Sequence, residues 1–509
     1  MNKTKIKQLL QEALKQHHVG NLDSADKIYV EILTIDNNDF DANHLHATVL
    51  SQKERYSESI KFFATAYESA NPTCELLNNY AIALRNLRAY SECEKLLIEA
   101  IKLDKNFGGS YRNLSNCYLS QKKFDDAINI LNTSIKLNLN TLDCHSSIVN
   151  ILFSKLSNNS DKNILRDLKN HLKILHASND KTLISQCALI YYNIGELEKS
   201  IELFKLAEKM YSDSVPSIDT LKNLSNKDVL KTFVIHEYEQ IKHIDSDEDG
   251  IRNMKITQDF YDYLENLSKK SATSYNDLDY AFISELHKVK YNKPPSAQKN
   301  YLNKSLDFKN IEHIYSSSKP EIVVVDNFLD DIFLEQLRIF YRCSNIFKYP
   351  YTRGYIGAFL GKGMANKSFL EFSNELIKSF KSIFKQYHLS QAWAFKYDSR
   401  REGIGIHADD AKVNVNFWIT PSSANKNPDN GGMIVWKKMP DKKATFKDFN
   451  SLKSMDKMNE DIKDADYVKV PYKANRAVIF NSKLYHVTDK IEFGDNYKDR
   501  RVNVTLLYK

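Results

Sequence analysis

A repeat of 34 residues near the start of this 509-residue chain limits its fold more than any other feature of the sequence. Three columns of side chains recur at that spacing over four repeats. The two mostly small columns are Ala13, Ala47, Ala81 and Ser115, and Ala25, Ser59, Cys93 and Ala127; the bulky column is Tyr29, Phe63, Leu97 and Leu131. Small residues let the two helices of a hairpin approach closely, and bulky residues fill the space before the next hairpin. The period therefore predicts a stack of helical hairpins.

These columns resemble those of tetratricopeptide repeats, with Gly20 in the turn of the first hairpin and Pro72 after the second hairpin. The period is lost from about 142 to 180 and then returns once. The returning columns hold Ala188, Gly195, Ser200, Phe204 and Ala207. The resemblance implies an all-α solenoid over residues 1–212 whose concave face binds a protein or peptide. A solenoid that only dimerises or supports the rest of the chain is the alternative.

A second pattern lies far downstream: His407-Ala408-Asp409, then His486, then Arg501. On a β-strand, residues i and i+2 point to the same face, so His407 and Asp409 could offer an imidazole nitrogen and a carboxylate oxygen to one metal ion. His486, from another strand, would complete three ligands and leave the opposite side of the ion open. Two histidines and one carboxylate in this arrangement are typical of non-haem Fe(II) oxygenases. Arg501 could then pair in bidentate fashion with an acidic cosubstrate.

Several β-rich segments surround these residues, and residues 319–509 as a whole resemble the 2-oxoglutarate- and Fe(II)-dependent oxygenases of the prolyl 4-hydroxylase-like group. The resemblance implies a double-stranded β-helix, or jelly roll, with flanking helices and iron at one mouth. It also implies that His407, Asp409 and His486 bind Fe(II) and that Arg501 binds the distal carboxylate of 2-oxoglutarate. The reaction implied is hydroxylation of a C–H bond with O₂, coupled to decarboxylation of 2-oxoglutarate to succinate.

Two further residues gain a role from this resemblance. Tyr397 stands ten positions before His407, where similar enzymes often place a tyrosine that contacts the cosubstrate. Asn416 falls on the strand after the ligand pair, on a face that such folds turn toward the cosubstrate. The alternatives are a plain interior aromatic for Tyr397 and a hydrogen-bonded core amide for Asn416.

Arg500 competes with Arg501 as the anchor of the cosubstrate. Strand alternation favours Arg501, because it shares a face with Asn503 and Thr505. Against this, the 15 positions between His486 and Arg501 are more than is common in these enzymes. The sequence therefore ranks the two arginines without deciding between them.

Residues 213–318 are expected to form a helical, charge-rich region that connects the two parts. His236 and Glu237 lie there, in a segment with apolar residues at helical spacing. The residue four positions after His236 is Gln240, which is not a metal ligand, so the sequence predicts a partly exposed helix face. Residues 437–466 are rich in Lys and Asp, and they are predicted to form a surface helix or lid beside the barrel mouth.

Composition adds three expectations. The formal charge of +7, from 72 basic and 65 acidic residues, comes without a basic block, so nucleic-acid binding is not supported. The six cysteines include no Cys-x-x-Cys pair, which suggests buried thiols in a reducing compartment. No apolar run reaches membrane-spanning length, and a cytoplasmic protein that does not bind membranes is expected.

The leading hypothesis is a 2-oxoglutarate- and Fe(II)-dependent dioxygenase that hydroxylates a protein, peptide or other substrate recruited by the repeats. The first alternative is a repeat scaffold whose oxygenase fold has lost turnover. The second is a hydrolase-like zinc site held by His407, Asp409 and His486, although this alternative leaves Arg501 without a role. The substrate itself is not identified by the sequence.

Overall fold

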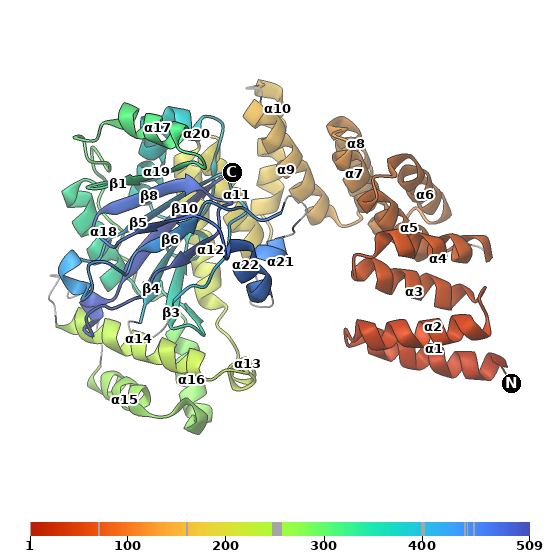
Figure 1. Cartoon of the computed structure of the whole chain (residues 1–509), viewed down its shortest axis with the longest axis horizontal. Helices are drawn as coiled ribbons and strands as arrows, with labels where there is room; N and C mark the ends of the chain where they lie inside the picture. The colour runs from red at the N-terminus through yellow and green to blue at the C-terminus, as the bar shows by residue number, and fades with distance from the viewer. Residues whose placement is uncertain are drawn as a thin grey trace. The chain divides into compact units, whose positions relative to one another are not determined.

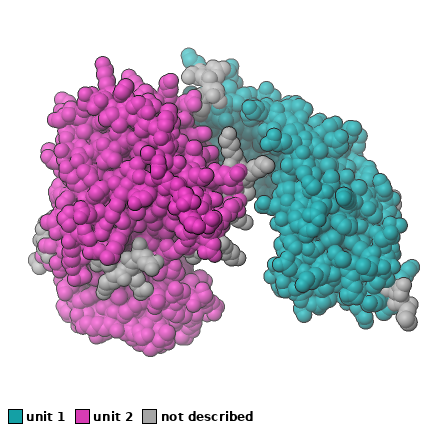
Figure 2. Space-filling model, in the orientation of Figure 1, with its two compact units in different colours: residues 1–177 teal, residues 178–509 magenta. Residues whose placement is uncertain are grey.

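The computed structural model describes residues 2–69, 72–158, 161–246, 257–398, 403–441, 444, 446–450 and 454–509. The chain divides into two compact units, Met1–Ala177 and Ser178–Lys509 (Figure 2). Within the described residues, no helix combines the length and the apolar character needed to cross a membrane.

Unit 1 consists of antiparallel helical hairpins, as the 34-residue period predicts (Figure 1). The ten helices that the structure describes there are α1 (Asn2–His18), α2 (Leu22–Ile35), α3 (Phe40–Gln52), α4 (Tyr56–Ser69), α5 (Cys74–Asn86), α6 (Tyr90–Leu103), α7 (Gly108–Ser120), α8 (Phe124–Lys136), α9 (Thr141–Asn158) and α10 (Lys162–His176). The small and bulky columns are buried between these helices. α9 and α10, with 18 and 15 residues, are longer than most of the preceding helices, which accounts for the loss of the period beyond 142.

The turn inside each of the first four hairpins repeats the same backbone conformation. Gly20, Glu54, Arg88 and Lys122 follow one another at the repeat spacing, and their φ angles are 78°, 60°, 64° and 61°. A left-handed residue ends a helix and redirects the chain, and glycine adopts this conformation without strain. Of these four turns, only the first has glycine at this position. The other three place Glu54, Arg88 and Lys122 in a left-handed conformation that residues with a side chain rarely adopt.

Unit 2 combines helices with two antiparallel sheets (Figure 1). The described helices of eight or more residues are α11 (Lys181–Asn193), α12 (Leu197–Asp213), α14 (Asp228–Asp245), α15 (Gln258–Lys269), α16 (Asp277–Leu286), α17 (Phe308–Ser317), α18 (Asp331–Cys343), α19 (Lys367–Ser379) and α22 (Met455–Ile462). The hairpin α11–α12 carries the returning repeat columns. It packs against the rest of unit 2, because Tyr192 Oη donates to the carbonyl of Leu370 and Asn193 Nδ2 donates to the carbonyl of Leu389.

The larger sheet has seven strands in the order β1-β8-β5-β10-β4-β3-β2, and the smaller has the order β7-β6-β9. The strands are β1 (Ile322–Val325), β2 (Tyr349–Tyr351), β3 (Tyr355–Phe359), β4 (Leu389–Tyr397), β5 (Val413–Trp418), β6 (Met433–Trp436), β7 (Tyr467–Val470), β8 (Arg476–Asn481), β9 (His486–Thr488) and β10 (Val502–Tyr508). One buried apolar cluster joins Val478 and Phe480 of the larger sheet to Met433 and Val435 of the smaller sheet. The two sheets therefore share a core.

The two faces of the seven-stranded sheet have different neighbours. On the back face, Phe417 of β5 packs against Phe328 and against Phe372 of α19, with ring centroids 5.7 Å apart in both pairs. On the front face, Phe395 and Tyr397 of β4 belong to the core that the two sheets share. Alternation along each strand thus decides which side chains meet helices and which meet the smaller sheet.

Candidate metal centre

His407, Asp409 and His486 come together in unit 2, as the sequence predicts. Their potential ligand atoms lie within 4.8 Å of one another. His407 Nε2 is 4.0 Å from Asp409 Oδ1, and His486 Nε2 is 3.5 Å from Asp409 Oδ2. Two imidazole nitrogens and a carboxylate oxygen thus face one small space.

The backbone around His407 differs from the β-strand that the sequence predicts for the ligand pair His407 and Asp409. The segment is irregular and makes one antiparallel bridge to β9, where the amides of His407 and His486 each donate to the carbonyl of the other residue, at 3.1 and 2.8 Å. The amide of Asp409 donates instead to the carbonyl of Ser482. Gly403, with a φ of 77°, lies just before this segment. Tertiary hydrogen bonds, rather than a regular ladder, place the first two ligands.

The ring of each histidine is oriented by a backbone carbonyl two positions earlier in the sequence. Nδ1 of His407 lies 2.9 Å from the carbonyl of Gly405, and Nδ1 of His486 lies 2.9 Å from the carbonyl of Leu484. A carbonyl can only accept, so both Nδ1 atoms carry a proton, and Nε2 is the atom through which each ring can bind a metal. Burial lowers the pKa of His407 to about 4, and nearby His486 contributes, so the ring is neutral at pH 7. Neutral imidazoles with free Nε2 atoms are what a divalent metal requires.

Asp409 is held as a carboxylate. Burial alone would raise its pKa, but the neighbouring His486 and His407 and the amide of Asn414 lower the pKa below the usual value. Asn414, on β5, donates from Nδ2 to Asp409 Oδ2 at 3.0 Å. The sequence leaves Asn414 open between a hydrogen-bonded core amide and a contact to the cosubstrate, whereas in the structure its amide orients a candidate ligand.

Arg501 and the three candidate ligands line one cavity of about 40 Å³, which we call the inner cavity. Its guanidinium donates from Nε to the carbonyl of Gly431 and from Nη2 to that of Gly432, at 2.6 and 3.2 Å. It lies over the ring of Tyr397, 4.8 Å from the centroid. Arg501 is only 2 % exposed and makes no ion pair with any carboxylate that the structure describes.

Tyr397 and Asn416 line the same cavity. The hydroxyl of Tyr397 lies 3.4 Å from Thr488 Oγ1, and burial raises its pKa. Asn416 donates from Nδ2 to Thr505 Oγ1 at 2.9 Å, while its Oδ1 has no hydrogen-bond partner among the described residues. Both residues are therefore placed for contact with a ligand in the cavity, and their roles remain predictions.

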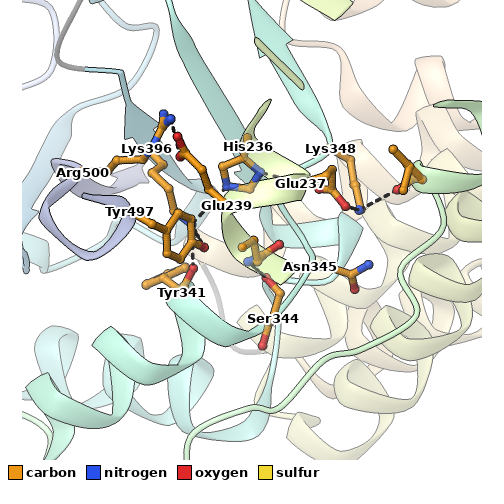
Figure 3. Close-up of polar contacts among 12 residues, drawn as sticks. His236, Glu237, Glu239, Tyr341, Ser344, Asn345, Lys348, Lys396, Tyr497 and Arg500 are labelled. Atoms are coloured by element: carbon orange, nitrogen blue, oxygen red, sulfur yellow. Dashed lines mark hydrogen bonds and ion pairs between the residues drawn. The ribbon is translucent and has the colours of Figure 1, made fainter. Parts of the chain in front are cut away.

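Arg500 occupies the back face of the sheet. Its Nη2 pairs with Glu239 Oε2 of α14 at 2.5 Å (Figure 3). The placement follows the alternation argument, because Arg501 lines the cavity while its neighbour Arg500 pairs with a helix on the other side. The two arginines therefore have separate environments despite being adjacent in sequence.

The prediction of a partly exposed helix face around His236 is wrong. His236 and Glu237 are 0 % and 1 % exposed. Glu237 accepts from Lys348 Nζ at 2.8 Å, and Lys396 Nζ lies 3.2 Å from His236 Nε2 (Figure 3). The partners lie more than a hundred positions away, so no local pattern could show that α14 is buried against the back of the sheet.

A second, larger pocket of about 660 Å³ opens onto His407 and Asp409, and we call it the outer pocket. Part of the 437–466 region borders it: Asn450 and Met455 line the pocket. This region also supports the ligand segment, since Asn450 Nδ2 donates to the carbonyl of Ala408 and the amide of Ala408 donates to the carbonyl of Phe449. The region forms α21 (Phe446–Phe449) and α22, so a helical segment does lie beside the candidate site.

Comparison with known proteins supports the helical repeats. The family model of the tetratricopeptide repeat matches residues 109–141, which cover α7 and α8. Coatomer subunit epsilon of Dictyostelium discoideum is 28% identical over 80 residues, which are 16% of this chain and 27% of that protein. This chain therefore spans about a quarter of the length of that relative. Unit 1 contains tetratricopeptide repeats.

Similar solved structures match at low overall similarity. The Pseudomonas aeruginosa protein pilF matches with a TM-score of 0.34 and 18% identity, covering 42% of this chain and 95% of that chain. PilW, a type IV pilus biogenesis factor, matches with a TM-score of 0.34 and 14% identity, covering 40% and 92%. The tetratricopeptide-repeat protein YrrB matches with a TM-score of 0.24 and 15% identity, covering 42% and 93%.

Proposed function

We propose that unit 2 is a 2-oxoglutarate- and Fe(II)-dependent dioxygenase, with its two sheets forming a double-stranded β-helix. The observation that carries the proposal is one connected site. Two imidazoles and a carboxylate face one space, and a buried arginine without an ion-pair partner among the described residues lines the same cavity. A metal alone would explain the first group, whereas an acidic cosubstrate explains both.

The donor set fits Fe(II). His407, Asp409 and His486 would hold the ion, which prefers two histidines and one carboxylate with open positions for other ligands. Bound iron with 2-oxoglutarate and O₂ supplies the oxidation of an unactivated C–H bond, with succinate and CO₂ as coproducts. A structural zinc site closes its coordination with four protein ligands. Among the described residues only these three form such a group, which favours an open catalytic site.

The protein residues of the inner cavity would bind and orient the cosubstrate. Arg501 offers parallel N–H donors to the distal carboxylate, a geometry that carboxylates accept in bidentate fashion. Its position over Tyr397 fixes the guanidinium plane. Tyr397 and Asn416 present a hydroxyl and an unpartnered amide oxygen to the same space. Burial excludes water around Arg501 and strengthens its interaction with an anion.

We further propose that the repeats of unit 1 recruit a protein or peptide. Repeat arrays of this type present long binding surfaces. Unit 1 contains a pocket of about 300 Å³ lined by α8, α9 and α10, including the amides of Asn132, Asn163 and Asn170. Such amides can bind the backbone of an extended peptide through paired hydrogen bonds.

The test is an anaerobic titration of the full chain with Fe(II) and then 2-oxoglutarate, observed as the visible absorption band of the iron–cosubstrate chelate. We expect the band in the wild type and its loss in His407→Ala. His313→Ala, which removes an exposed histidine of α17, is the matched control and should keep the band. Succinate release should then follow substrate addition. Folded wild type without any band would contradict the proposal and favour a repeat scaffold.

A further inference from the structure

The outer pocket has an aromatic wall. Tyr351, Tyr355, Phe359, Trp393 and Phe395, from β2, β3 and β4, all line it. Four of them, all but Phe395, are only partly buried. Tyr351 and Tyr355 stack with centroids 4.5 Å apart, and Phe395 meets Tyr355 edge-on at 5.1 Å. A contiguous group of partly exposed rings beside a candidate catalytic site provides an apolar surface for a ligand.

The charged side chains of the outer pocket differ in whether they have a partner of opposite charge. Asp410 is paired with Lys509, whose Nζ lies 2.7 Å from Asp410 Oδ2. Asp409 belongs to the metal centre. Arg353, in the turn between β2 and β3, makes no ion pair with a carboxylate in the described part of the chain. Its side chain donates from Nη2 to the thioether of Met455 at 3.1 Å, and a thioether is a weak acceptor.

The position of Arg353 connects it to the candidate metal centre. Its guanidinium lies against Gly405, where an added Cβ would be only 2.3 Å from Nη1. The carbonyl of Gly405 in turn accepts from the ring of His407. An anion bound by Arg353 would therefore lie beside the metal ligands, with the aromatic wall within reach of whatever the anion is attached to.

We propose that the outer pocket selects substrates in which an anionic group lies next to an apolar or aromatic moiety, with Arg353 binding the anion and the rings of β2–β4 packing against the moiety. The inference rests on the proposed function only for calling the ligand a substrate. Carboxylate and phosphate share the required chemistry, since each accepts two hydrogen bonds from a guanidinium. A neutral peptide side chain would leave Arg353 with a thioether as its best partner. Arg353 is thus a specificity-determining residue.

The experiment measures binding of three probes by ligand-observed NMR titration of the full chain without added metal. Phenylacetate and phenyl phosphate carry the anion, and phenylacetamide is the neutral isostere of the first. We expect phenylacetate or phenyl phosphate to bind about tenfold more tightly than phenylacetamide, or about 1.4 kcal/mol. Whichever anion binds more tightly identifies the anionic group.

Variants assign the preference to one side chain. Arg353→Gln should remove the preference for anions, Arg353→Lys should keep part of it, and Lys509→Gln, which removes the paired cation of the same pocket, should keep all of it. Equal affinity of the wild type for the three probes would overturn the inference. A preference that survives in Arg353→Gln would also overturn it and would indicate that another cation binds the anion. The binding assay uses no iron. Its result therefore tests the anion preference of the outer pocket even if the dioxygenase proposal fails.

Discussion

Arg500 and Arg501 lie next to each other just before β10, on opposite faces of the larger sheet, and only Arg500 has a carboxylate partner among the described residues. On the back face, Arg500 pairs with Glu239, and Lys348 beside them pairs with Glu237. On the front face, Arg501 donates only to carbonyl and amide oxygens among the described residues. Arg500, with its internal counter-ion, contributes to the fold, whereas Arg501 lines a cavity without a counter-ion among the described residues, the environment expected of a side chain that binds an external anion. The comparison separates a paired charge from a candidate ligand-binding charge at two adjacent positions.

The largest effect is expected on the back face. Glu237→Gln should lower the free energy of unfolding of unit 2 by about 3 kcal/mol or more, because it leaves the buried Lys348 ammonium without its carboxylate. Chemical unfolding followed by tryptophan fluorescence reports on unit 2 alone, since Trp393, Trp418 and Trp436 all lie there.

The matched control for that variant is Glu335→Gln, which breaks half-exposed pairs with Arg338 and Arg342. Surface pairs contribute about 1 kcal/mol or less, so its unfolding midpoint should stay close to that of the wild type. If both variants lost the same free energy of unfolding, the buried Glu237–Lys348 pair would contribute no more to stability than a surface ion pair.

Replacing each of the two arginines by glutamine, one at a time, tests the comparison directly. Arg501→Gln should weaken 2-oxoglutarate binding about a hundredfold, because a charge-assisted bidentate pair contributes about 1.5–3 kcal/mol. Arg500→Gln should weaken binding less than tenfold and instead reduce stability. Anaerobic titration of the Fe(II) protein with 2-oxoglutarate gives both affinities. Similar affinities in the two variants would refute the assignment of separate roles.

The smallest expected effect concerns the support of the metal ligands. Asn414→Ala removes the donor to Asp409 and should weaken metal affinity about tenfold, as is common when the hydrogen-bond partner of a ligand is lost. Asn416→Ala is the control, because Asn416 donates to Thr505 and not to a candidate ligand. Competition with a metal-binding dye measures the affinities. A larger loss in the control than in Asn414→Ala would contradict the role of Asn414.

Periodic features of the chain were predictable from sequence. The 34-residue columns predicted the hairpins of unit 1, because each column position is buried by its nearest neighbours along the chain. Alternation along β10 predicted that Arg501, Asn503 and Thr505 share one face, and all three line the inner cavity. Both patterns depend on local geometry that repeats every turn or every second residue.

Features made by distant partners were not predictable. The burial of His236 depends on Lys396, 160 positions away, and the polar spacing of α14 resembles that of a solvated helix. Arg353 gave no signal, since its place beside Gly405 arises only when the β2–β3 turn meets the ligand segment. The irregular backbone at His407 likewise depends on its bridge to His486.

The Arg500–Arg501 doublet also constrains how this chain can change in length. A residue added before Arg500 falls in the 3₁₀ turn Tyr497–Asp499 or the loop that precedes it, where β10 keeps its pairing with Lys396 and Phe395. A residue added between Arg501 and Val502 would shift both arginines by one place, so Arg501 would turn to Glu239 and the cavity would lose its guanidinium. Insertions should therefore be tolerated before Arg500, whereas selection should remove insertions between Arg501 and Val502.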